Sequence, residues 1–121
     1  VGDTSALYDL NSLALFKKLT QPTILFIINN NGGAIFDMLP VDAEVKDKFY
    51  RMPHHTEFSQ VVSMFDLKYA RPYTWADLSS VLKQAYSRRE ATIIEIKVAP
   101  NDGSTIYKRL IDQISYAVVG E

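Results

Sequence analysis

Apolar and polar positions along the chain predict strands and helices that follow one another in turn. Segments with strand-forming residues occur at Thr23–Ile28, Lys68–Ala70 and Ala91–Val98. The stretches between them repeat their apolar residues every three or four positions, which is the spacing of a helix with one buried face. Gly33–Leu39 is predicted as a short helix and Val41–Lys48 as a surface segment. Strands that alternate with helices predict an α/β fold with a mostly parallel sheet flanked by helices.

The first predicted helix has an apolar face about four turns long, or roughly 20 Å. Ser5 is a suitable N-cap for it, and Pro22 ends the pattern. The strand that follows is also roughly 20 Å long, so the chain runs back along the sheet and returns by the same distance. The apolar face consists of Leu7, Leu10, Leu13, Ala14 and Phe16.

Three more helices are predicted in the rest of the chain. One runs from Thr56 to about Phe65, and another runs from Thr74 to about Ser87. Asp77 stands three residues after Thr74, which is the spacing of a capping box. We expect Trp75, on the apolar face of that helix, to lie in the core. The last helix is indicated by the apolar residues Ile106, Leu110, Ile114 and Val118.

Polar side chains stand where the predicted strands end. Asp3 precedes the first helix, and Asn30 follows the strand Thr23–Ile28. Because that helix and strand have equal lengths, both side chains are expected at carboxyl ends of parallel strands, where open α/β sheets bind ligands. A carboxylate, a neutral carboxamide and the backbone carbonyl of Gly32 suit Mg²⁺, which takes oxygen ligands and often shares them with phosphates. The pattern indicates a magnesium–diphosphate site.

A structural interpretation of these residues stays open at this point. An aspartate between a strand and a helix often only caps the helix, and the run Asn29–Gly33 is a common turn sequence. Ser5 has two possible roles, as the helix cap or as a hydrogen-bond donor to the diphosphate. The sequence pattern alone does not choose between these interpretations.

Several stretches of the chain resemble one enzyme family. Gly2-Asp3 followed by Asn29-Asn30 is similar to the thiamine-diphosphate signature Gly-Asp-Gly … Asn-Asn, with Thr4 where glycine is usual. The chain as far as about Ser115 resembles the bacterial 2-succinyl-5-enolpyruvyl-6-hydroxy-3-cyclohexene-1-carboxylate synthases of menaquinone biosynthesis, in which a residue larger than glycine is expected at that position. The stretches that carry the likeness are Gly2–Asn11, Asn29–Phe36, Phe49–Pro53 and Met64–Tyr69.

The resemblance implies the thiamine-diphosphate-binding fold, with residues 1–121 as the C-terminal portion of the domain that binds diphosphate and magnesium. It implies thiamine diphosphate and Mg²⁺ or Mn²⁺ as cofactors. Asp3, Asn30 and Gly32 would be metal ligands, the last by its carbonyl. Together with Ser5 they would form the cofactor-binding set of this chain.

The resemblance also implies an activity. Enzymes of this family decarboxylate 2-oxoglutarate on thiamine diphosphate and add the succinyl semialdehyde carbanion to isochorismate. Ile35, Phe36 and Leu39 match positions that contact the apolar ring of isochorismate, although core packing of a short helix is an open alternative. The glutamate that activates the cofactor has no counterpart here, so no catalytic residue is assigned. The isolated chain is expected to be inactive.

We expect the chain to be N-terminally truncated, because Val1 is not an initiating methionine and only Val1 remains of the strand before Gly2-Asp3. The remaining domains of the same enzyme would be its partners, in a homodimer or homotetramer. Two other functions stay open. One is another thiamine-diphosphate enzyme, such as a 2-oxo acid decarboxylase or an acetolactate-type synthase, and the other is a non-enzymatic α/β interaction domain.

Composition narrows the possible partners. The 121 residues have a net charge of −1 and no long run of one sign, which argues against nucleic acid as the main partner. The longest apolar runs are too short to span a bilayer. The chain has no cysteine and no visible signal peptide, which favours a cytoplasmic protein without disulfides.

Overall fold

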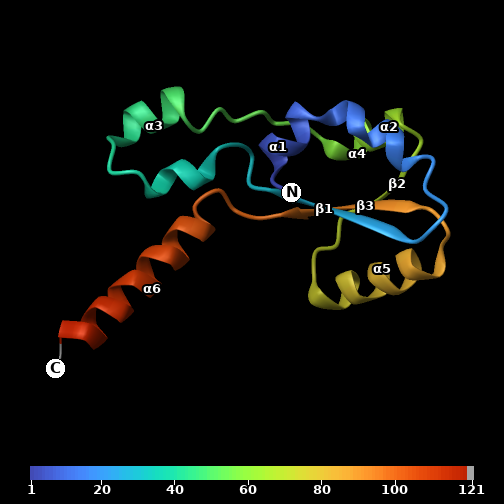
Figure 1. Ribbon diagram of the computed structural model, residues 1–121. Helices are drawn as coiled ribbons and strands as arrows, with labels where there is room; N and C mark the ends of the chain where they lie inside the picture. The colour runs from blue at the N-terminus through green and yellow to red at the C-terminus, as the bar shows by residue number, and fades with distance from the viewer. Residues whose placement is uncertain (120–121) are drawn as a thin grey trace. The chain divides into compact units, whose positions relative to one another are not determined.

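The computed structural model describes the backbone of residues 1–119 and the side chains of residues 1–115. These residues form two compact units, each assembled from two separate stretches of the chain. Unit 1 consists of Val1–Asn29 and His55–Lys97 and contains the sheet (Figure 1). Unit 2 consists of Asn30–His54 and the stretch from Val98 onward, and its described part consists of helices and loops.

Unit 1 is built around a parallel sheet of three strands in the order β1-β3-β2. The strands are β1 (Thr23–Asn29), β2 (Lys68–Ala70) and β3 (Ala91–Lys97). The central strand β3 pairs with both neighbours, with Ile27 of β1 opposite Glu95 and Tyr69 of β2 opposite Ile93. The three predicted strands and their parallel arrangement are confirmed.

Helices cover both faces of this sheet. The helical elements of unit 1 are α1 (Asp3–Tyr8), the 3₁₀ helix η1 (Leu10–Ser12), α2 (Leu13–Phe16), α4 (Phe58–Met64) and α5 (Trp75–Ser87). Figure 1 shows α1, α2 and α4 on one face and α5 on the other. The buried core cluster lies on the first of these faces, and its members are Leu13, Ile27, Phe58, Val62 and Ile93. The expected α/β layers are confirmed.

The prediction of one continuous first helix is wrong. The chain leaves the helical conformation at Asp9, with φ −126° and ψ 39°, and continues as η1 and then α2. Ser12 Oγ donates a hydrogen bond to the Asp9 carbonyl at 2.8 Å. Short polar side chains such as those of Asp9, Asn11 and Ser12 compete with the helix for backbone hydrogen bonds. The apolar spacing survives this interruption, so Leu13 still reaches the core.

The helix α5 has the predicted capping box. Thr74 Oγ1 accepts from the Asp77 amide at 3.1 Å, and the Asp77 carboxylate accepts from the Thr74 amide at 3.0 Å. The expectation for Trp75 is wrong, because its side chain is 86% exposed. The apolar side chains of α5 are covered by the rest of the unit only from Leu78 onward. Trp75 lies in the first turn, beside Lys97 at the end of β3.

Unit 2 contains the 3₁₀ helix η2 (Ala34–Met38), α3 (Ala43–Phe49) and α6 (Asp102–Val119). The predicted short helix at Gly33–Leu39 and the last helix are confirmed. The predicted surface segment Val41–Lys48 is exposed and largely forms α3. The apolar row of α6 is exposed at Ile106, Leu110 and Ile114, while the Val118 side chain lies outside the described residues.

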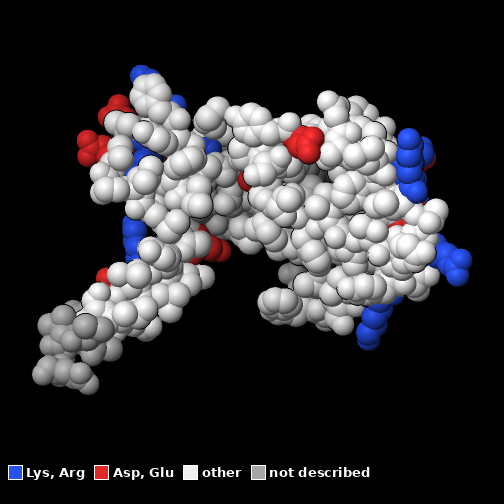
Figure 2. Space-filling model, viewed as in Figure 1, with Lys and Arg blue, Asp and Glu red and all other residues white. Residues whose placement is uncertain are grey.

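Charged side chains of both signs stand singly or in small groups over the visible face of the molecule, most of which is uncharged (Figure 2). In the described part of the chain, every helix is too short or too polar to span a bilayer.

Candidate functional site

The N-terminal residues extend the sheet of unit 1 beyond β1. The Ile28 amide donates to the Val1 carbonyl at 2.9 Å, and the Val1 amino group donates to the Phe26 carbonyl at 2.8 Å. Gly2 is bridged to Ile28 in parallel. Asp3 therefore follows the carboxyl end of an extended segment next to β1, as the sequence predicted.

Asp3 is buried, with 2% of its side chain exposed. Its Oδ1 accepts hydrogen bonds from the Thr4 amide at 2.7 Å and from the Thr4 hydroxyl at 3.5 Å. The residue lies in the first turn of α1, where the backbone N–H groups favour a negative charge. Unit 1 thus carries a carboxylate of defined orientation at this edge of its sheet.

The predicted role of Ser5 as the N-cap is wrong. Gly2 is the N-cap residue of α1, with φ −76° and ψ 158°, and Ser5 is the third residue of the helix. The helix begins early because the chain turns directly after the residue that pairs with β1. Ser5 is exposed, and its proposed contact with the diphosphate stays a prediction.

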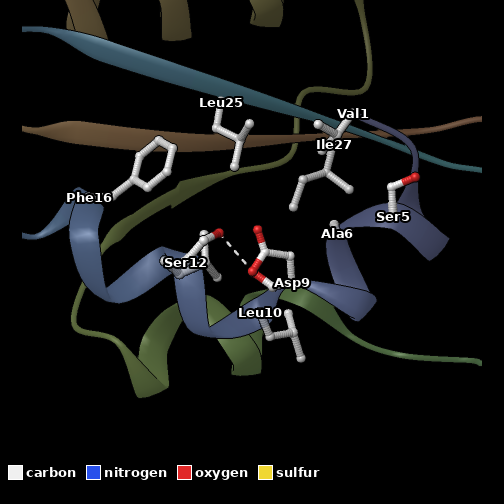
Figure 3. Close-up of a pocket in the computed structure, with 10 residues that line it drawn as sticks. Val1, Ser5, Ala6, Asp9, Leu10, Ser12, Phe16, Leu25 and Ile27 are labelled. Atoms are coloured by element: carbon white, nitrogen blue, oxygen red, sulfur yellow. Dashed lines mark hydrogen bonds between the residues drawn. The ribbon is translucent and has the colours of Figure 1, made fainter.

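A cavity of about 240 Å³ lies between the first helical segments of unit 1 and β1 (Figure 3). Its lining is mostly apolar, and its polar members are Ser5, Asp9 and Ser12. No lysine or arginine is among the residues that line it. The cavity is therefore suited to an apolar group.

In unit 2, the turn after Asn30 requires glycine at position 32. Asn31 has φ 65° and Gly32 has φ 127°, and both values lie in the left-handed region. A Cβ on Gly32 would lie 2.2 Å from the Arg51 carbonyl oxygen. The Gly33 amide donates to that same oxygen at 2.7 Å. The turn is thus packed tightly against the backbone of Arg51.

Sequence reasoning missed the role of Arg51 in unit 2. Its Nε donates to Asp37 Oδ1 at 2.8 Å, and its other guanidinium nitrogens lie 2.9 Å from Asp47 Oδ1 and 3.3 Å from Asn101 Oδ1. Asp37 is 6% exposed, whereas the Arg51 side chain is 35% exposed, so the carboxylate is buried and the guanidinium still reaches water. The hydrogen bond to Asp37 raises the pKa of the Arg51 guanidinium. Arg51 therefore stays charged and joins three segments of the unit.

Three apolar residues assigned to substrate binding lie on or next to η2. Ile35 is 66% exposed, Phe36 is 40% exposed and Leu39 is 38% exposed. Phe36 packs against Tyr50, with 5.5 Å between the ring centroids. These side chains are not part of a buried core in the described residues, so their apolar surface is available for contacts. Their role with isochorismate stays a prediction.

A buried polar cluster at the same edge of the sheet in unit 1 was also missed. Asn29 Nδ2 donates to Glu95 Oε1 at 2.6 Å, and the Tyr69 hydroxyl donates to Glu95 Oε2. Glu95 is fully buried and Asn29 is 5% exposed. Burial and the hydrogen bond to Glu95 raise the pKa of the Tyr69 hydroxyl above its ordinary value. The only sequence signal is a glutamate among the isoleucines Ile93, Ile94 and Ile96.

The predicted metal ligands have suitable chemistry for Mg²⁺ or Mn²⁺. Asp3, Asn30 and the Gly32 carbonyl all offer oxygen donors, and Asp3 already lies at the strand end in unit 1. Asn30 follows Asn29, the last residue of β1, and is the first residue of unit 2. That these three oxygen donors share one metal ion stays a prediction. Among the residues described, no cluster of three His, Cys, Asp or Glu side chains is arranged to hold a metal.

Comparison with solved structures defines the class of fold. The chain superposes on part of a thiamin diphosphate-dependent enzyme from Mycobacterium smegmatis with a TM-score of 0.63 and 17% identity, covering 83% of this chain and 17% of the other. A benzoylformate decarboxylase from Polynucleobacter necessarius gives a TM-score of 0.67 and 15% identity, over 83% of this chain and 19% of the other. The chain has the α/β fold of thiamine-diphosphate-dependent enzymes, as the resemblance predicted.

Sequence relatives narrow this class, although no family model matches the chain. It is 82% identical over 120 residues to the 2-succinyl-5-enolpyruvyl-6-hydroxy-3-cyclohexene-1-carboxylate synthase of Mannheimia succiniciproducens and 79% identical over 121 residues to that of Pasteurella multocida. These matches cover 99% and 100% of the chain but 21% of each relative. The chain is related over its whole length to one part of these synthases, which confirms the resemblance.

Proposed function

We propose that the protein carrying this chain is a thiamine-diphosphate-dependent synthase, a transferase of menaquinone biosynthesis. It would decarboxylate 2-oxoglutarate and join the remaining four-carbon unit to isochorismate. The 82% identity over 120 residues to the synthase of Mannheimia succiniciproducens supports this proposal most strongly. Residues 1–121 would be the C-terminal portion of the domain that binds diphosphate and metal. They would act with the remaining domains in a cytoplasmic homodimer or homotetramer.

Within that enzyme, this chain would hold Mg²⁺ or Mn²⁺ against the diphosphate. The Asp3 carboxylate would supply one negative charge, and Asn30 would add a neutral side-chain oxygen that does not repel the diphosphate. Gly32 would add its carbonyl oxygen, because its backbone conformation is held by close packing against Arg51. Ser5, exposed on α1, would hydrogen-bond the diphosphate.

Thiamine diphosphate, when bound, supplies the electron sink for decarboxylation and carbon–carbon bond formation. The residues of this chain would bind and orient the reactants. Ile35, Phe36 and Leu39 offer exposed apolar surface that would contact the ring of isochorismate. No side chain of this chain is assigned a proton-transfer role, so the isolated 121-residue chain should not turn over. Detectable carboligation by that chain would contradict this assignment.

The metal proposal is tested with Asp3→Ala in the full-length protein that carries this sequence. Binding of thiamine diphosphate is followed by titration calorimetry with and without Mg²⁺. We expect the variant to bind about 100-fold more weakly or worse, since even partners outside the ligand set are worth about 10–100-fold. Asp9→Ala is the matched control, because Asp9 is an exposed carboxylate at the end of the same helix. Equal binding by both variants would rule out Asp3 as a ligand.

A product assay distinguishes this activity from other thiamine-diphosphate chemistry. The full-length protein is incubated with 2-oxoglutarate, isochorismate, thiamine diphosphate and Mg²⁺, and the products are separated by mass spectrometry. The proposal predicts an adduct that requires both substrates. Release of the decarboxylated aldehyde alone would identify a 2-oxo acid decarboxylase, and the absence of any cofactor binding would favour a non-enzymatic domain.

A further inference from the structure

Glu95 lies at the centre of unit 1, where a carboxylate is costly to place. It is fully buried in the central strand β3, and its neighbours Ile93 and Ile94 are fully buried as well. A carboxylate removed from water requires donors at both of its oxygens. Oε1 accepts from Asn29 Nδ2 at 2.6 Å, and Oε2 accepts from the Tyr69 hydroxyl. An apolar side chain at position 95 would avoid the cost of burying a charge, so the presence of a glutamate there needs an explanation.

The cluster joins all three strands near their carboxyl ends. Asn29 is the last residue of β1, Glu95 lies two residues before the end of β3, and Tyr69 lies in β2. The register places Glu95 opposite Ile27, so its side chain is on the face that carries the core. The Asn29 side chain, two residues after Ile27, lies on that same face. The Glu95 carboxylate therefore holds the side chain of Asn29, the final residue of β1.

We propose that Glu95 is a positioning residue for the metal site, and this inference rests on the proposed function. Its carboxylate fixes the Asn29 carboxamide and thereby the point at which β1 ends. Asn30 follows directly, and its backbone direction is set by Asn29. Residues that orient a metal ligand from outside the ligand set commonly change metal affinity about 10–100-fold when they are replaced. Glu95 would act on the metal through Asn29, without touching it.

The competing explanation is that the cluster only fixes the register of the strands. The two explanations predict different things for the two hydrogen bonds of Glu95. If Glu95 acts on the metal through Asn29, loss of the Asn29 bond weakens metal binding while loss of the Tyr69 bond does not. If the cluster serves only the sheet, both losses lower stability and neither changes metal affinity beyond that.

The test exchanges the hydrogen-bond donor and acceptor between Asn29 and Glu95. Asn29→Asp places two carboxylates 2.6 Å apart and removes the hydrogen bond. The double variant Asn29→Asp with Glu95→Gln restores the bond in the reverse direction, because the glutamine amide donates to the aspartate. Tyr69→Phe is the matched control, since it removes the other hydrogen bond and leaves the Asn29 bond intact. All variants are made in the full-length protein.

The readouts are the Mg²⁺ dissociation constant in the presence of thiamine diphosphate and the melting temperature without ligands. We expect about tenfold weaker Mg²⁺ binding in Asn29→Asp, recovery in the double variant and near-native binding in Tyr69→Phe. Native affinity in Asn29→Asp, or a recovered melting temperature without recovered affinity, would overturn the inference. If Asn29→Asp does not fold, Asn29→Leu, which removes the donor and leaves the Tyr69 bond intact, gives the same comparison with Tyr69→Phe.

The unchanged protein separates this inference from the proposed function. If it does not bind thiamine diphosphate with Mg²⁺, the proposed function fails. If it does bind both, and the Asn29 and Glu95 variants bind equally well, only the positioning role is refuted.

Discussion

Replacement of Gly32 by alanine should destabilise unit 2, because the position combines an unusual backbone conformation with a close contact. Its φ of 127° lies in the region that L side chains rarely adopt. A Cβ would lie 2.2 Å from the Arg51 carbonyl oxygen, whereas ordinary contact begins at 3.4 Å. That oxygen accepts the Gly33 amide at 2.7 Å and cannot retreat without weakening the bond.

The expected cost follows from these two effects. A strained backbone conformation costs about 1–3 kcal/mol, and a lost hydrogen bond costs about 0.5–1.5 kcal/mol. The Arg51 side chain is also held by Asp37 and Asp47, which limits how far its backbone can shift. We therefore expect Gly32→Ala to lower the free energy of unfolding by about 2–4 kcal/mol.

Urea unfolding followed by far-ultraviolet circular dichroism measures this change. Gly103→Ala is the matched control, because a Cβ on Gly103 meets nothing within 4 Å. Gly103 is the second residue of α6, where alanine should leave the stability unchanged or raise it by up to about 1 kcal/mol. If Gly32→Ala and Gly103→Ala unfold at the same urea concentration, the packing argument for the turn is refuted.

Two further predictions concern unit 1. Phe58→Ala should lower the free energy of unfolding by about 3–5 kcal/mol, because Phe58 is fully buried in the core cluster. Met64→Ala on the same helix, at a side chain that is 73% exposed, should change it by less than about 0.5 kcal/mol, and a similar loss in both would contradict the assigned core. Tyr69→Phe should remove part of the pH dependence of stability. Because the folded state raises the pKa of Tyr69 above 10.0, the stability due to its hydroxyl is complete below pH 10.0 and falls as the pH rises further. The urea midpoints of the unchanged protein and of Tyr69→Phe should therefore converge between about pH 8 and about pH 11. A constant difference between the two midpoints would refute the role assigned to the Tyr69 hydroxyl.

The elements of this fold were predictable where the signal is local. The spacing of Phe58 and Val62 marks the buried face of α4, and Thr74 with Asp77 marks the start of α5. Trp75 was misplaced because periodicity assigns a residue to a helix face but does not show how far the sheet extends beneath it. The first helix was overextended because apolar spacing continued through the polar residues that interrupt it.

The candidate site was predictable only in part, because some of its contacts join residues that are far apart in the sequence. Asp3 at a strand end follows from the order and length of the elements around it, and the pairing of Gly2 with Ile28 agrees. The contact between Asn29 and Glu95 joins residues 66 positions apart and depends on which strand is central. Strand order is not encoded in any local pattern, so this contact required the structure.

The order of the strands has a consequence for synthesis on the ribosome. The central strand β3 is the last of the three along the chain, and β1 and β2 pair with it and not with each other in the described sheet. Thr23 of β1 can pair with β3 only after Ala91 has been synthesised, and Lys68 of β2 can do so only after Thr92 has been synthesised. Strands that pair over such long separations form slowly, and their unpaired edges are prone to aggregation in the meantime. Until β3 has emerged during translation, β1 therefore lacks its neighbour on one side, and β2 lacks the only partner that it has in the described sheet.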